Sequence, residues 1–172
     1  NFRLADGEFA VMVGSNGSGK SSLLALIAGS FLPDCGSIRL GGEDLTCQPE
    51  HRRAGRIGRV FQNPFSGTAP DLSIAENLAM AAGKGNPRGF GWMLGRGTMG
   101  EIRGRVKELN MGLEDRLSDS IGGLSGGERQ ALTLLMATWV RPRLLLLDEH
   151  TAALDPKAAE IILTLSEELI RK

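Results

Sequence analysis

A glycine-rich loop near the start of the chain has the residues needed to hold phosphate groups. Gly14 to Ser21 reads Gly-Ser-Asn-Gly-Ser-Gly-Lys-Ser and fits the pattern G-x-x-x-x-G-K-[ST] at every fixed position. Glycines let the backbone curl so that successive N–H groups point at phosphate oxygens, and a helix beginning near Lys20 adds its positive dipole end. In this pattern Lys20 reaches the β- and γ-phosphates, and the Ser21 hydroxyl binds Mg²⁺. The predicted nucleotide-binding residues of this loop are Gly14, Ser15, Asn16, Gly17, Ser18, Gly19, Lys20, Ser21 and Ser22.

Two carboxylates follow a run of leucines far downstream. Leu144 to Leu147 leads directly into Asp148 and Glu149. Adjacent residues of a strand point to opposite faces, but the backbone turns at the end of a strand, so both carboxylates can face one crevice. Ligands of open α/β sheets lie there, outside the carboxyl ends of the strands. We therefore expect both side chains to face the nucleotide.

A third stretch lies between these two. Leu124 to Gln130 reads Leu-Ser-Gly-Gly-Glu-Arg-Gln. We expect Ser125, Gly126 and Gly127 at the N-terminus of a helix, where backbone N–H groups form an anion site. A phosphate loop alone shows only that some nucleotide is bound. All three stretches in this order resemble the ATPase subunit of an ATP-binding-cassette (ABC) transporter, and the resemblance runs from about Gly7 to Ala158.

The resemblance implies a role for each candidate side chain. Asp148 matches the residue that holds Mg²⁺ through its water shell, and Glu149 matches the general base that polarises the attacking water. Gln62 matches the glutamine that senses the γ-phosphate and Mg²⁺ at the hinge between the core and a helical lobe. The implied catalytic residues are Lys20, Gln62 and Glu149, and the implied metal-binding residues are Ser21, Gln62 and Asp148.

The resemblance also implies that the site is shared between two copies of the chain. Ser125, Gly126 and Gly127 would cap the γ-phosphate of an ATP bound by a second copy, in a head-to-tail dimer with two ATP at its interface. Ala153-Leu154-Asp155 matches the stretch that crosses this interface. His150 stands where the family usually has proline. Its ring either shifts the proton affinity of Glu149 or points away as a tolerated variant.

Hydrophobic periodicity and turn residues predict the elements that position these groups. Ser73 and Glu76 form the capping box of one helix start. Residues 83–100 are predicted to be an irregular loop. The expected strands are Phe9–Val13, buried and leading into the phosphate loop, Ser37–Gly42, turning on two glycines, Arg56–Phe61 and Leu144–Leu147. The expected helices are Lys20–Ala28, one from Ser73, Met99–Asn110, Glu128–Val140 and Pro156–Arg171.

These elements predict an α/β fold: a P-loop NTPase core with a mainly parallel sheet flanked by helices, an inserted helical lobe and a small β-hairpin region. We expect residues 1–172 to form a single domain. Residues 1–63 and 141–172 would make the ATP-binding core, and 64–140 the helical lobe. Both ends look cut, because the family's adenine-stacking aromatic residue and its later histidine have no counterpart. His51 and His150 do not occupy that histidine's place.

Composition limits the possible partners. Lys and Arg number 20, as do Asp and Glu, which argues against nucleic acid as a bulk electrostatic partner. No apolar run approaches the roughly 20 residues of a membrane helix. Cys35 and Cys47 lack C-x-x-C spacing, and with His51 they still lack a fourth metal ligand, so free thiols are expected.

The predicted function is ATP hydrolysis that powers transport, with ATP and Mg²⁺ as cofactors. The predicted partners are a second ATPase subunit, transmembrane permease subunits and a periplasmic substrate-binding protein. Residues 149–157 and 67–70 are similar to a bacterial importer group. The chain would be cytoplasmic and would lie on the inner face of the plasma membrane through the permease. Two other classes remain open: a soluble ABC ATPase acting on ribosomes, DNA or chromosomes, and an iron–sulfur assembly ATPase.

Overall fold

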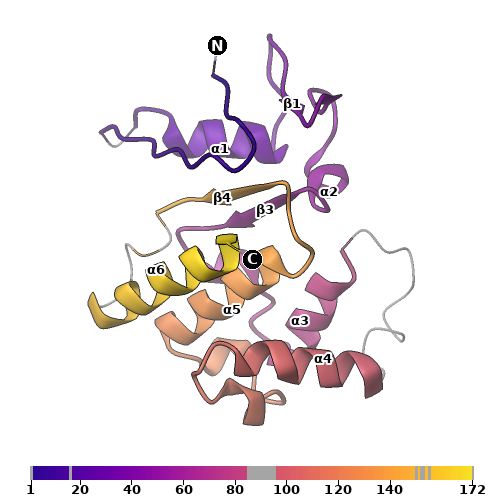
Figure 1. Ribbon diagram of the computed structural model, residues 1–172, viewed down its shortest axis with the longest axis vertical. Coiled ribbons are helices and arrows are strands. Elements are labelled where there is room, and N and C mark those ends of the chain that lie inside the picture. The colour runs from indigo at the N-terminus through magenta and orange to yellow at the C-terminus, as the bar shows by residue number, and fades with distance from the viewer. Residues whose placement is uncertain are drawn as a thin grey trace.

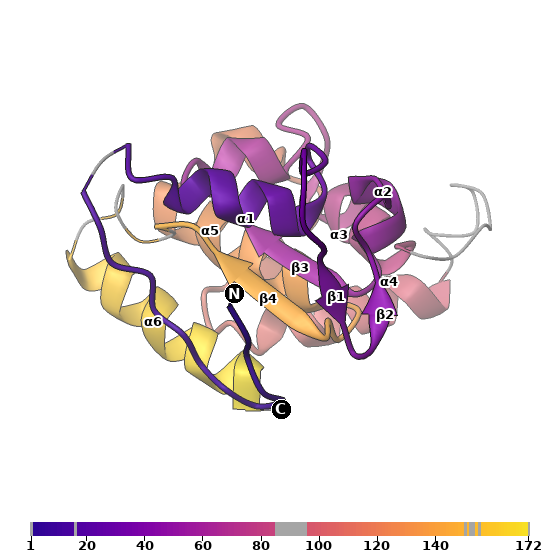
Figure 2. The ribbon, with the colours of Figure 1, turned by 90° about the horizontal axis from the view of Figure 1, so that it is seen from above.

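A pair of short parallel strands lies at the centre of the molecule. The computed structural model describes residues 2–15, 17–84, 96–149, 151, 154 and 156–171. Strand β3 (Ile57–Val60) pairs in parallel with β4 (Leu144–Leu147), with Val60 opposite Leu147. Helix α1 (Lys20–Ala28) covers one face of the pair, and α5 (Gly126–Thr138) and α6 (Pro156–Arg171) cover the other (Figures 1 and 2). The bounds of β4 and α6 are those predicted.

Side chains of β4 alternate between two hydrophobic clusters. Leu144 and Leu146 belong to the cluster beneath α1, whereas Leu145 and Leu147 pack against the cluster that contains α5. This is the period of two that a strand buried on both faces requires. At Gly58 of β3, a Cβ atom would lie 2.5 Å from the carbonyl oxygen of Ala137, so only glycine lets α5 approach the strand this closely.

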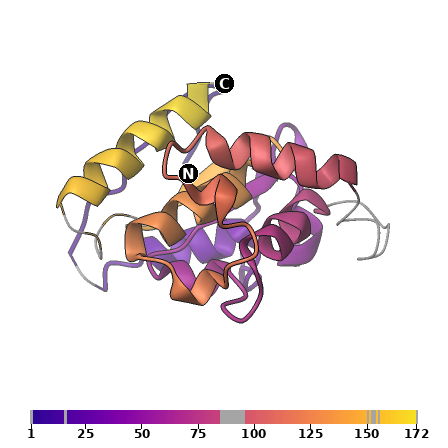
Figure 3. The ribbon, with the colours of Figure 1, turned by 90° about the horizontal axis from the view of Figure 1, so that it is seen from below.

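The larger cluster joins the helices on the side away from α1. Helices α3 (Ile74–Ala82) and α4 (Arg96–Lys107) pack against each other, and α3 also packs against α5. These three helices stand in front of α1 when the molecule is seen from below (Figure 3). Short 3₁₀ turns lie before α3 at η1 (Pro64–Gly67) and between α4 and α5 at η3 (Leu113–Asp115) and η4 (Ile121–Gly123). The predicted capping box of α3 is present in full.

A small hairpin is linked to the end of α1 by the hydrogen bonds of one arginine. Strands β1 (Arg39–Leu40) and β2 (Glu43–Asp44) pair in antiparallel fashion, as the glycines at 41 and 42 predicted, and α2 (Glu50–Arg53) follows. The Arg53 side chain is fully buried. Its guanidinium donates to the carbonyl oxygens of Leu26 and Ile27 at the end of α1, and to those of Thr46 and Gln48 after the hairpin. Burial lowers the pKa of Arg53.

One predicted strand is wrong. Residues 9–13 form no strand, and Val13 is 92% exposed. A strand needs a hydrogen-bonded neighbour. Within the described residues, the only partner of β3 is β4 and no strand pairs with this segment.

Several boundaries also differ from the prediction. Helix α4 begins at Arg96 rather than Met99 and ends at Lys107, so the loop expected over 83–100 is helical from residue 96, and residues 85–95 lie outside the described ranges. Helix α5 spans Gly126–Thr138 instead of Glu128–Val140, and its N-cap is Ser125, which was expected at the N-terminus of this helix.

Two further expectations concern the cysteines and the apolar character of the helices. Cys35 and Cys47 are free and exposed, as predicted. None of the helices that the structure describes combines the length and apolar character needed to cross a bilayer.

Candidate functional site

The glycine-rich loop leads into α1 without a side-chain cap. Gly19 is the N-cap of α1 with φ of 91°, in the left-handed region that favours glycine. The Lys20 ammonium donates to the carbonyl oxygens of Gly14 at 2.8 Å and Ser15 at 3.1 Å. In the described part of the chain, no group accepts from the backbone N–H of Lys20, Ser21 or Ser22. The loop therefore presents unpaired donors and a cation, which is the chemistry that binds phosphate. Asn16 lies outside the described residues.

The loop meets the carboxylate that follows β4. The Ser21 Oγ donates to the Asp148 Oδ1 at 3.0 Å, across 127 residues of sequence. Because β3 and β4 are parallel, their carboxyl ends fall at one edge, and the Asp148 N–H still bonds to the Val60 carbonyl at 3.1 Å. At the same edge the Gln62 Nε2 donates to the Glu149 Oε2 at 3.0 Å. Four of the predicted site residues thus form two contacting pairs.

The backbone of Glu149 is in an unusual conformation. Its φ is 43°, whereas most non-glycine residues avoid positive φ. Such residues cost about 1–3 kcal/mol each and cluster at active sites and switch regions. The predicted general base therefore has a strained backbone, and its carboxylate is oriented by the hydrogen bond from Gln62.

The Ser21 and Asp148 side chains fit a magnesium ion. A hydroxyl and a carboxylate already in contact are hard oxygen donors, and Mg²⁺ usually takes one or two carboxylates together with substrate phosphates and waters. The residues that the structure describes contain no cluster of three or more His, Cys, Asp or Glu that could hold a metal by itself. The donor set therefore suits a metal that arrives with a nucleotide.

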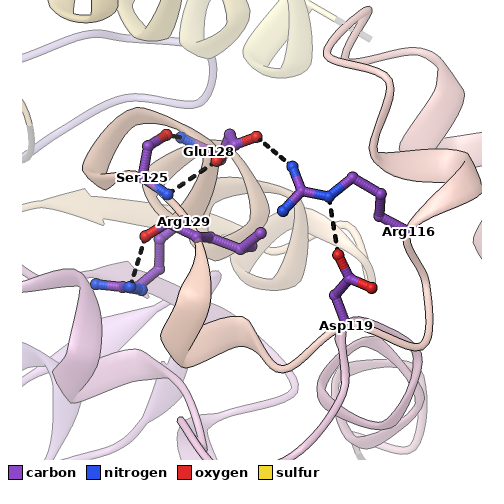
Figure 4. A network of polar contacts seen from close by, with 6 residues as sticks. Arg116, Asp119, Ser125, Glu128 and Arg129 are labelled. Carbon is purple, nitrogen blue, oxygen red and sulfur yellow. Dashed lines mark hydrogen bonds and ion pairs between the residues drawn. The ribbon is translucent and has the colours of Figure 1, made fainter.

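The start of α5 is a second site with unpaired donors. Ser125 is the N-cap, and its hydroxyl accepts from the Glu128 N–H while Glu128 Oε2 accepts from the Ser125 N–H at 2.8 Å (Figure 4). The N–H groups of Gly126 and Gly127 have no acceptor within the described ranges. Two backbone donors at a positive helix end therefore remain available to an anion.

A buried arginine supports this end of α5. The Arg129 guanidinium donates to the carbonyl oxygens of Ile121, Gly122 and Leu124, and burial lowers its pKa. Its guanidinium carbon lies 3.7 Å from the centroid of the Phe65 ring. The loop that follows Gln62 therefore contacts α5 at Arg129, and Arg129 in turn bonds to the segment that precedes Ser125.

A second arginine reaches the capping box from outside. Arg116 Nη1 lies 2.8 Å from Glu128 Oε1, and Arg116 Nε lies 2.9 Å from Asp119 Oδ2 (Figure 4). The pKa of Glu128 is lowered, first by the Ser125 backbone N–H and also by Arg116. Glu128 is therefore an ionised acceptor with both oxygens engaged.

Some predicted groups are not brought together within one chain. Across the described residues, no hydrogen bond or ion pair joins Ser125, Gly126 or Gly127 to the loop at 14–21. His150, Ala153 and Asp155 lie outside those residues. Sequence patterns assigned no role to Arg116 or Phe65, and they included Arg129 only as part of the stretch at 124–130. The spacing of Ser125 and Glu128 is a capping-box signal that would have placed the start of α5.

Comparisons with known proteins agree on the family. The sequence profile described as "ABC transporter" matches residues 1–152. The chain is 38% identical over 169 residues to the tyrosine transport ATP-binding protein of Clostridioides difficile (strain R20291), covering 98% of this chain and 67% of that protein. It is 36% identical over 175 residues to the lipoprotein-releasing system ATP-binding protein LolD 1 of Caulobacter vibrioides, covering 98% and 70%.

A third relative and a solved structure extend the match. The chain is 35% identical over 161 residues to the molybdate/tungstate import ATP-binding protein WtpC of Methanocaldococcus jannaschii, covering 92% of this chain and 50% of that protein. The fold matches the ATP-binding cassette MJ0796, solved as a dimer in a post-hydrolysis state bound to ADP and Pi, with TM-score 0.81 and 26% identity over 99% of this chain and 72% of that one. This match confirms the predicted α/β P-loop fold class. The chain belongs to the ABC transporter family, as its ATP-binding and ATP-hydrolysing domain.

Proposed function

We propose that this chain binds Mg-ATP between the loop at Gly14–Ser21 and the carboxyl ends of β3 and β4. The hydrogen bond from Ser21 to Asp148 carries the proposal, because it brings together the two groups that would share the metal. Gln62 and Glu149 make the adjacent contact. The unpaired N–H groups at the start of α1 supply the phosphate contacts.

In the proposed reaction the protein positions groups and neutralises charge. Lys20 exchanges its two carbonyl acceptors for β- and γ-phosphate oxygens. Ser21 and Asp148, with Gln62 as the third predicted ligand, would hold a Mg²⁺ ion, which would supply positive charge beside the phosphates. The Glu149 carboxylate accepts a hydrogen bond from the attacking water and orients it. Gln62, which donates to Glu149, fixes the direction of that carboxylate.

We propose further that each ATP-binding site is completed by a second copy of the chain. The free N–H groups of Gly126 and Gly127 support this step, because nothing in the described part of their own chain uses them. The solved relative in its ADP- and Pi-bound state is also a dimer. In a head-to-tail pair the Ser125 end of one copy would face the phosphate loop of the other.

A membrane permease is the proposed partner, and a cavity of about 430 Å³ is its proposed docking site. The cavity is lined by residues 66–69 of the loop after Gln62, by residues of α3 and α5, and by Glu50, Arg59, Phe61 and Lys84. Met80, Ala81, Met136 and Ala137 make it apolar, while Glu50, Arg59 and Lys84 add charge. A permease helix bound in this cavity would be displaced when the Gln62 loop moves. The same loop contacts Arg129 through Phe65.

The permease would hold the chain at the inner face of the plasma membrane, and import with a periplasmic substrate-binding protein is the proposed direction. The names of the relatives support transport over the ribosome, DNA and iron–sulfur alternatives. Those names concern tyrosine, lipoprotein release and molybdate or tungstate. The cargo is therefore expected to depend on the partner subunits. Identifying the proteins that co-purify with the chain from its host tests this assignment.

Mixing two inactive variants tests the shared site. In the intact protein, Lys20→Ala removes the phosphate-binding ammonium, and Ser125→Arg blocks the α5 end. Each variant alone has a defect in both sites of its dimer, whereas a mixed dimer has one site without a defect. We expect ATP hydrolysis of the mixture to exceed that of either variant, once capture on two different tags shows that mixed dimers form. Equal, negligible activity in those mixed dimers would contradict the shared site.

A matched pair of charge reversals tests the docking site. Lys84→Glu changes the lining of the cavity, and Lys107→Glu makes the same change on exposed α4, away from it. We expect Lys84→Glu to reduce co-purification of the permease while Lys107→Glu does not. Equal recovery of permease with both variants would place the partner elsewhere.

A further inference from the structure

The anion-binding end of α5 carries a negative charge in its first turn. Glu128 is the third residue of the helix, and its Oε2 accepts from the Ser125 N–H. An acidic residue in the first turn stabilises a helix by its favourable interaction with the dipole. The same charge opposes any anion that approaches the N–H groups of Gly126 and Gly127. The proposed γ-phosphate site therefore needs something to offset Glu128.

Arg116 is placed to do this. It lies in the loop between η3 and η4, and its guanidinium bonds to the Glu128 oxygen that the capping box leaves free (Figure 4). Asp119 fixes the other edge of the guanidinium at 2.9 Å. The Glu128 side chain is only 22% exposed, so this pair is screened less than a fully exposed one.

The start of α3 has the same capping box and lacks this arrangement. Glu76 closes the box with Ser73 but forms no ion pair with any residue that the structure describes. The next two N–H groups of α3, those of Ile74 and Ala75, are taken by the carbonyl oxygens of Asp119 and Leu117. Of these two capping boxes in the described residues, only that of α5, whose next two N–H groups have no acceptor there, has an arginine paired with its glutamate.

We propose that Arg116 is a positioning residue for the ATP bound by a second copy of the chain. It holds the Glu128 side chain in the capping box and offsets its charge, so that the γ-phosphate can reach the N–H groups of Gly126 and Gly127. This inference rests on the shared site proposed above. Arg116 itself touches neither the nucleotide nor the reacting water.

The test is a double-mutant cycle in the intact protein. Arg116→Gln, Glu128→Gln and the double variant are each combined with Glu149→Gln, which slows turnover so that the ATP-bound dimer persists. The readout is the ATP concentration that gives half-maximal dimer in size-exclusion chromatography. Gln at 128 keeps an oxygen for the Ser125 N–H and removes the charge. We expect Arg116→Gln alone to raise that concentration by about tenfold, and the double variant to stay within about twofold of Glu128→Gln.

Three controls separate this role from a merely structural one. Arg116→Lys keeps the charge and should retain most of the dimer. Arg103→Gln removes a neighbouring surface pair with Asp115, at 3.2 Å, and should change nothing. Raised salt should shrink the Arg116→Gln defect, because repulsion between like charges is screened.

The outcomes are distinguishable. An equal defect of Arg116→Gln with Glu or Gln at 128, or no defect at all, overturns the inference while the shared site stands. Failure of the Glu149→Gln protein with Arg116 intact to dimerise with ATP overturns the shared site itself.

Discussion

Helices α3 and α5 begin with the same local chemistry and use it differently. Both have a serine N-cap and a glutamate three residues later, and both boxes are closed by reciprocal hydrogen bonds. In α3 the following two N–H groups bond to the Asp119 and Leu117 carbonyls, so these donors at the start of the helix are already used within the fold. In α5 the N–H groups of Gly126 and Gly127 have no acceptor in the described residues. A capping motif thus marks a helix start, and the neighbouring carbonyls decide whether that start can bind a ligand.

The largest expected effect comes from removing one free donor. Gly126→Pro replaces the first residue of α5, where proline is well tolerated, and Ser125 already has the ψ of 161° that a residue before proline prefers. We expect ATP hydrolysis by the intact protein to fall about 10²- to 10³-fold, as for loss of one preorganised donor, with thermal unfolding nearly unchanged. Full activity in steady-state phosphate release would show that this N–H does not serve the reaction.

The corresponding change in α3 should affect stability instead. Ala75→Pro removes the N–H that bonds to the Leu117 carbonyl at 3.0 Å. Leaving that carbonyl unpaired costs about 1–3 kcal/mol, and the restriction on Ile74 before proline adds to this cost. Urea unfolding should show the loss, while activity per folded molecule stays near that of the unmodified protein. A selective loss of turnover would break the contrast between the two helices.

Removing each cap serine should give equal stability losses and unequal functional ones. Ser73→Ala and Ser125→Ala each delete a side-chain acceptor for the N–H of the third helical residue. Each should lower the free energy of unfolding by about 1 kcal/mol. Only Ser125→Ala should reduce ATP-dependent dimer formation, measured on the same preparations. If both variants impair the dimer equally, the loss of stability explains the effect, and the location of Ser125 at the start of α5 does not.

The smallest effect is a shared dependence on pH. The pKa of Glu76 is lowered by its hydrogen bonds from Ser73, and that of Glu128 by those from Ser125. A lowered folded pKa contributes stability above the ordinary glutamate value of 4.5 and loses it as pH falls through the folded value. Glu76→Gln and Glu128→Gln should each flatten the acid limb of stability below about pH 4.5. Acid unfolding curves that stay as steep as before would show that these carboxylates are not the groups titrating.

The sequence predicted the elements whose information is local. The capping box at Ser73, the strand Leu144–Leu147 and the helix Pro156–Arg171 are confirmed because caps, leucine runs and a proline at the first turn act over a few residues. The strand at Phe9–Val13 is wrong because strand formation depends on a neighbouring strand, which a local pattern cannot supply.

In the candidate site, too, local patterns predicted some residues, whereas others depend on contacts between distant segments. The types and order of Lys20, Ser21, Asp148 and Glu149 indicated phosphate and metal chemistry, and the structure places Ser21 against Asp148. The roles assigned to these residues stay predictions. Arg116 and Arg129 could not be selected from sequence, because their acceptors are carbonyls and carboxylates that only the folded loops bring within reach.

The buried Arg53 links the turn after the hairpin to α1, the helix that follows the phosphate loop, so a label on this turn can report movement of that helix. Because one guanidinium bonds both to the end of α1 and to the carbonyls of Thr46 and Gln48, the helix and the turn after the hairpin are held as one rigid piece. Cys47 lies between those two carbonyls, and its thiol is free and exposed. After Cys35→Ser, a single fluorophore or spin label on Cys47 would report any displacement of α1 when nucleotide binds, without altering a predicted site residue.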